Sequence, residues 1–134
     1  MQSHSRRQAL KLMTAASLIP LATPASAEQT FSIVAFGDSL TAGYGLPPED
    51  AFTTRLEQRL KANGLNVEVV NAGVSGDTSK GGLSRIDWSV PDGSGLVIVE
   101  LGANDALRGI SPAETAKNLD AILARLRQRG IAVL

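Results

Sequence analysis

Four short apolar segments along the chain have the composition of β-strands. Three of them are Phe31 to Phe36, the valine-rich segment Asn66 to Asn71, and Leu96 to Leu101, which is almost continuously aliphatic. A continuous aliphatic run is typical of a strand that is buried on both faces in a parallel sheet. The fourth segment, Ile131 to Leu134, begins another strand of the same kind.

Helical patterns alternate with these strands. In residues 49–63, Phe52, Leu56 and Leu60 recur every four residues before Gly64, where a helix end is expected. A second helix is predicted near residues 78–88, after a loop that follows the second strand. The third begins at the capping residue Ser111, which is followed by a proline and then a glutamate. Its apolar stripe consists of Ala116, Leu119, Ile122, Leu123 and Leu126.

This alternation predicts an α/β domain with a parallel sheet covered by helices on both faces. The links are short, apart from a loop rich in glycine and proline at residues 41–48. Right-handed crossovers place the strand at 31–36 between those at 66–71 and 96–101. The carboxyl ends of all three strands then meet at one edge of the sheet, beside the switch point where such sheets bind ligands.

The first 27 residues have the pattern of an export signal. Arg6 and Arg7 precede a short apolar stretch, and Ala25-Ser26-Ala27 is a small-residue cleavage site. The paired arginines resemble a twin-arginine signal, and an ordinary Sec signal is the alternative. We therefore expect a leader at 1–27, a periplasmic or secreted location, and one domain at 28–134. The apolar stretch is too short to span a membrane, and without cysteine no lipoprotein anchor is possible.

Composition narrows the function classes for this domain. Residues 28–134 carry 13 acidic and ten basic residues, a weak negative balance that gives no support to nucleic-acid binding or to a basic membrane patch. The whole chain has no cysteine, which excludes disulfides, thiol catalysis and thiolate metal sites.

Polar and glycine residues follow each of the first three strands. Ser39 lies at the carboxyl end of the first strand, after a glycine that permits a sharp turn, which is where hydrolases with open α/β sheets place a nucleophile. Gly73 after the second strand allows close backbone approach, and Asn104 after the third supplies an uncharged side-chain donor. Both residue types suit the stabilisation of an oxyanion. We expect local structural roles for Asp38 and Asp105.

Other conspicuous side chains have simpler expected roles. Tyr44, Phe52 and Trp88 are predicted to pack in the core or in loops, with Tyr44 the one candidate for substrate contact because its loop follows Ser39. Arg108 is expected to face solvent, and so are the three arginines that end the last helix.

Three motifs resemble those of the GDSL, or SGNH, hydrolases. They are Phe36-Gly37-Asp38-Ser39-Leu40-Thr41, Asn71-Ala72-Gly73-Val74-Ser75-Gly76-Asp77-Thr78 and Leu101-Gly102-Ala103-Asn104-Asp105. The following Ala106-Leu107-Arg108-Gly109 is similar to the branch that holds acyl-CoA thioesterase I, lysophospholipase L1 and bacterial arylesterases. The resemblance implies a three-layer, flavodoxin-like α/β/α fold and hydrolysis of carboxylic esters or acyl thioesters. It implies Ser39 as nucleophile, oxyanion donors from Ser39, Gly73 and Asn104, and no metal or cofactor.

The chain departs from the family pattern at the catalytic base. The family's Asp-x-x-His motif should follow a fifth strand, whereas the only histidine here is His4, within the predicted leader. We therefore expect the N-terminal portion of a longer domain, with the last strand and final helix missing and with little activity. The alternatives are a non-catalytic fragment that binds acyl ligands weakly and an enzyme acting on carbohydrate acetyl esters. The sequence leaves the oligomeric state and acyl preference open.

Overall fold

The structure is a computed structural model that describes residues 29–134. Its strands are β1 (Phe31–Gly37), β2 (Val67–Gly73), β3 (Leu96–Glu100) and β4 (Ala132–Val133). Its helices are α1 (Ser39–Ala42), α2 (Phe52–Ala62), α3 (Ser79–Ser89), α4 (Ala103–Leu107) and α5 (Pro112–Gln128), with the 3-10 turn η1 at Pro48–Asp50. The predicted leader, including His4, lies outside the described residues.

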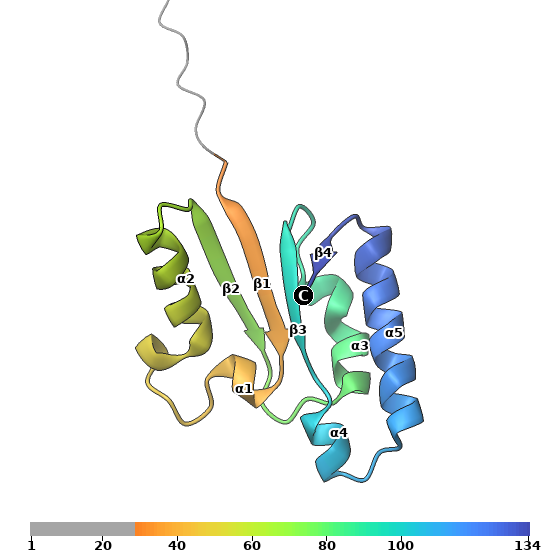
Figure 1. Cartoon of the computed structure of the whole chain (residues 1–134). Helices are drawn as coiled ribbons and strands as arrows, with labels where there is room; N and C mark the ends of the chain where they lie inside the picture. Colours follow the sequence, from red (N-terminus) through yellow and green to blue (C-terminus); the bar gives the residue numbers. More distant parts are fainter. Residues whose placement is uncertain (1–28) are drawn as a thin grey trace, which may run out of the picture.

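The four strands form a parallel sheet in the order β2-β1-β3-β4. Strand β1 is central, as predicted, and Gly37 at its end pairs with Gly73 of β2 and with Glu100 of β3. Figure 1 shows α1 and α4 together at the sheet edge where these strands end. The loops that follow β1, β2 and β3 therefore converge there.

Side-chain alternation divides the sheet into two covered faces. Val34 and Phe36 of β1 point toward α3 and α5 and join the main core cluster. The other members of that cluster are Ile86, Val90, Val97, Ile122, Leu126 and Ile131. Ile33 and Ala35 lie on the opposite face of β1, where α2 packs beside β2. The predicted three-layer α/β/α arrangement is confirmed.

The segment predicted as one helix over residues 49–63 is interrupted. Residues Pro48–Asp50 form η1, and Ala51 has the extended backbone angles φ −58° and ψ 139° before α2 begins at Phe52. Phe52 is exposed, and the buried residue of α2 is Thr53. The four-residue spacing therefore predicted the helix but not its start or its most buried position. No helix within residues 29–134 is long and apolar enough to cross a bilayer.

Candidate active site

Ser39 is the first residue of a one-turn helix that starts where β1 ends. Asp38 caps α1, since its Oδ1 accepts a hydrogen bond from Leu40 N at 3.0 Å. Gly43 caps the end of the helix with a φ of 81°, which favours glycine, and Ser39 is half-buried. The sequence predicted an irregular loop from Thr41, but the structure extends α1 to Ala42. This turn fixes the backbone of Ser39 against the sheet.

Gly73 packs directly against this turn. A Cβ atom on Gly73 would collide with the backbone of Thr41 and Ala42, so only glycine fits at this position. Its N–H donates to Asn71 Oδ1 at 3.0 Å. The close backbone approach that the sequence predicts for Gly73 is therefore made to α1, the helix that carries Ser39.

Asn104 reaches the same turn from the other side of β1. It lies on α4, and its Nδ2 donates to Asp38 Oδ2 at 3.0 Å. Asp38 thus links Leu40 N, in the turn of Ser39, to the amide of Asn104. The local role expected for Asp38 is present, and the carboxylate also joins two of the three loops. Asn104 thus contacts the residue before Ser39, and Gly73 packs on the backbone of Thr41 and Ala42 in the same turn.

Glu100 is a carboxylate of this edge that the sequence analysis did not single out. Its Oε2 accepts from Thr41 Oγ1 at 3.1 Å and from Asp38 N at 3.4 Å, so it supports α1 from the end of β3. Burial raises the pKa of Glu100, and the nearby Asp38 carboxylate adds to that rise, while the hydrogen bond from Thr41 opposes it. The sequence feature that could have indicated Glu100 is its charge near the end of an otherwise aliphatic strand.

Asp105 has the structural role that the sequence predicts. It is 1% exposed and accepts hydrogen bonds from the backbone N and the hydroxyl of Ser79, at the start of α3, and from Thr115 of α5. Burial alone would raise its pKa, but the Ser79 and Thr115 hydrogen bonds outweigh burial and lower the pKa. Asp105 therefore ties α4 to both helices of the main core.

Exposed apolar side chains extend from the loops that carry these residues. They are Leu40, Tyr44, Leu46, Val74 and Leu107.

Tyr44 is 79% and Trp88 75% exposed, so the expected packing of these aromatics in the core or loops is wrong. Arg108 is exposed as expected, although its Nη2 also donates to Gly76 O at 2.7 Å. Within the described part of the chain, no group of three or more His, Cys, Asp or Glu side chains could hold a metal ion.

The sequence of the chain is similar to those of known proteins. The model of the GDSL-like Lipase/Acylhydrolase family matches residues 35–134, a segment that contains all three motifs. The chain is 39% identical to Esterase TesA of Pseudomonas aeruginosa over 124 residues, which are 92% of this chain and 61% of that protein. It is 37% identical to an arylesterase of Vibrio mimicus over 114 residues, 82% of this chain and 56% of that protein. The chain thus spans a little over half the length of these curated relatives.

Solved structures match it in fold. The SGNH-hydrolase family esterase AlinE4 superposes with a TM-score of 0.74 at 50% identity, over 78% of this chain and 57% of that one. The crystal structure of TesA gives a TM-score of 0.73 at 39% identity, over 76% and 57% of the two chains. These matches confirm the family resemblance and the α/β fold expected from the sequence.

Proposed function

The chain belongs to the GDSL-like lipase/acylhydrolase family, and on that premise we propose that it is the nucleophile-bearing part of a serine hydrolase for carboxylic esters or acyl thioesters. The observation that carries the proposal is the position of Ser39 at the start of α1, with Gly73 packed on that turn and Asn104 bonded to its cap. An attacking serine and two oxyanion donors belong at one such sheet edge.

In the proposed reaction, Ser39 Oγ forms a bond to the acyl carbon, and the alcohol or thiol leaves with a proton. Water then hydrolyses the acyl-enzyme and releases the acid. The backbone N–H groups of Ser39 and Gly73 and the amide of Asn104 stabilise the oxyanion. Asn104 Nδ2 has a second N–H besides the one donated to Asp38. The N–H of Gly73 would give up its hydrogen bond to Asn71 Oδ1 and donate to the substrate oxygen instead.

The proton of Ser39 needs a base. The only histidine of the chain, His4, lies outside the described residues, and the family resemblance assigns the base to an Asp-x-x-His motif. We therefore propose that these 134 residues alone hydrolyse esters slowly, because removal of a triad member eliminates most of the rate. Free imidazole would partly replace the base.

The test is hydrolysis of p-nitrophenyl butyrate by the purified chain with increasing imidazole. Because free imidazole itself hydrolyses p-nitrophenyl esters, the rate without protein is subtracted at each imidazole concentration. We expect the remaining protein-dependent rate to be slow, to rise with imidazole and to be lost in Ser39→Ala. Ser75→Ala, at another serine of the same sheet edge, is the matched control and should behave as wild type. Equal rates for Ser39→Ala and wild type at every imidazole concentration would contradict the proposal and favour a non-catalytic acyl-binding role. Fast turnover without imidazole would contradict the slow-rate proposal alone.

The substrate class proposed is a small-molecule ester or thioester with an apolar acyl group. The support is the set of exposed apolar side chains around Ser39, among them Leu40, Val74 and Leu107. A series of p-nitrophenyl esters from acetate to decanoate tests this, because the carbohydrate acetyl ester alternative predicts the highest kcat/KM for acetate. We expect kcat/KM to rise from acetate to longer chains.

We also propose export by the twin-arginine-like leader at residues 1–27. Arg6→Lys/Arg7→Lys should keep the protein in the cytoplasm if the twin-arginine route is used, and should leave export unchanged if the signal is of the Sec type. Fractionation and N-terminal sequencing, with Ala27 expected as the last residue removed, distinguish the two.

A further inference from the structure

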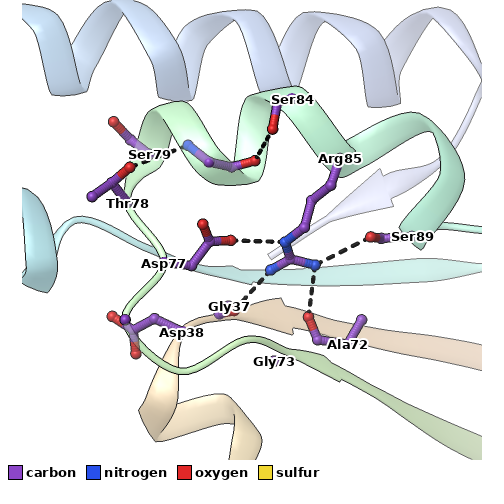
Figure 2. Close-up of polar contacts among 12 residues, drawn as sticks. Gly37, Asp38, Ala72, Gly73, Asp77, Thr78, Ser79, Ser84, Arg85 and Ser89 are labelled. Carbon is purple, nitrogen blue, oxygen red and sulfur yellow. Dashed lines mark hydrogen bonds and ion pairs between the residues drawn. The ribbon is translucent and has the colours of Figure 1, made fainter.

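The guanidinium of Arg85 lies buried beneath the ends of the two strands that lead to Ser39 and Gly73. Arg85 is on α3 and is 6% exposed. Its Nη2 donates to Gly37 O and its Nη1 to Ala72 O, both at 2.9 Å. Figure 2 shows the side chain descending from α3, with hydrogen bonds to both strand ends. One side chain thus joins the last residue of β1 to the second-last residue of β2.

Further contacts hold this guanidinium in place. Its Nε pairs with Asp77 Oδ2 at 2.7 Å, and Nη1 also donates to Ser89 Oγ at 3.2 Å. The Phe36 ring lies 4.0 Å from the guanidinium carbon, within the range of a cation–π contact. The planar fork of arginine can bind several acceptors at fixed angles, which the ammonium of lysine cannot do.

The two carbonyl acceptors are adjacent to the proposed chemistry along the chain. Gly37 O also accepts from Val74 N at 3.0 Å, so Arg85 adds a bond at the final link between β1 and β2. Gly37 precedes the Asp38 cap of Ser39, and Ala72 precedes Gly73. A shift of β1 against β2 at this point would change the distance between the Ser39 hydroxyl and the Gly73 N–H.

We propose that Arg85 is a positioning residue that fixes the turn of Ser39 relative to Gly73. The proposal rests on the proposed function of those two residues. Stability alone does not account for a buried ion pair here, because apolar residues of similar volume often stabilise a protein as well or better. A guanidinium that binds one carbonyl from each strand end gives a defined geometry that an apolar side chain cannot give.

The test uses the whole chain and a variant that removes both charges together, Arg85→Met/Asp77→Asn, so that no unpaired charge is left buried. Arg125→Met/Asp87→Asn is the matched control, because this exposed ion pair also joins an arginine to a backbone carbonyl, Leu83 O, away from Ser39. Arg85→Lys keeps the charge beside Asp77 and is the variant to test if the double variant does not fold.

Two readouts are compared well below the midpoint of thermal unfolding. The first is hydrogen exchange of the Val74 amide. The second is covalent labelling of Ser39 by a fluorophosphonate in the presence of imidazole, followed by intact mass. In that step the Oγ–P bond forms, the P–F bond breaks, fluoride leaves and imidazole takes the proton. The limiting rate and the half-saturating concentration of probe are determined separately.

For the Arg85 double variant we expect Val74 exchange to be at least tenfold faster and the limiting labelling rate at least tenfold slower, with the half-saturating concentration within threefold. The control should match wild type in both readouts. The exchange and labelling rates of Arg85→Lys should lie between those of wild type and of the Arg85 double variant. Wild-type exchange and labelling in folded Arg85 variants, even with a lowered melting temperature, would overturn the proposal. If wild type itself shows no labelling at Ser39, the proposed function fails, and Val74 exchange still decides whether Arg85 holds the strand ends.

Discussion

Glu100 and Asp105 are carboxylates on either side of the turn from β3 to α4, and their surroundings change their pKa in opposite directions. Asp105 is more deeply buried but accepts from Ser79 and Thr115, and its pKa is lowered. Glu100 is half-buried, lies near Asp38, and its pKa is raised. Burial by itself therefore does not decide the charge of an acidic residue at this edge. The number of donors and the nearest like charge decide it.

The largest expected effect is on stability at Asp105. Asp105→Ala leaves the amide and the hydroxyl of Ser79 without this acceptor inside the core, while Thr115 Oγ1 keeps Ser111 O as an acceptor at 3.3 Å. We expect unfolding in urea to require about 3 kcal/mol less free energy. Asp120→Ala, at an exposed acidic residue of α5, is the control and should change stability by at most about 0.5 kcal/mol. Equal stabilities for the two variants would contradict the structural role of Asp105.

The acid limb of the stability curve tests the charge of Asp105. Because its folded pKa is lower than the unfolded value of about 3.9, its contribution is present above that value and is lost as pH falls through the folded pKa. Asp105→Asn should be less stable than wild type at neutral pH, and this difference should shrink as pH falls below about 4. A difference that is constant with pH would contradict the lowered pKa.

Glu100→Gln should show the opposite trend at a smaller magnitude. Since the folded pKa of Glu100 is raised, wild type loses stability as pH rises from the unfolded value of about 4.3 through the folded value. The glutamine keeps an acceptor for Thr41 and has no charge to bury. Relative to wild type, the variant should therefore gain stability from about pH 4 to pH 7. Urea unfolding at both pH values measures this change, and no gain would reject the raised pKa.

Thr41→Val is the smallest of these changes. It removes the hydroxyl that donates to Glu100 Oε2, at a loss of about 1 kcal/mol. Because that hydrogen bond lowers the pKa of Glu100, the variant should raise this pKa further. Carboxyl ¹³C titration by NMR measures the shift. An unchanged titration curve would mean that the Thr41 hydrogen bond does not lower the pKa of Glu100.

Much of the fold followed from the sequence because its main signals are local. The strand composition, the Ser111 cap, whose Oγ accepts from Glu114 N at 3.2 Å, and right-handed crossovers together predict the observed strand order. The break at Ala51 and the short helix α1 were missed, because neither is long enough to show a period.

The supporting residues of the candidate site were harder to predict than its motifs. Ser39, Gly73 and Asn104 each follow a recognisable strand, whereas Arg85 lies inside a helix pattern where arginine is normally exposed. Its burial depends on carbonyls from two strands distant in the chain, Gly37 O and Ala72 O. Glu100 likewise depends on Thr41, which η1, α2, β2 and α3 separate from it along the chain. Such contacts are visible only once the sheet is assembled.

The central place of β1 also has a consequence for the order of folding during synthesis. Strand β1 leaves the ribosome before both of its neighbours, because β2 starts at Val67 and β3 at Leu96. At roughly 5–20 residues per second, its two edges stay unpaired for some seconds. The apolar strand that ends two residues before Ser39 is therefore most open to aggregation or chaperone capture while the protein is being made.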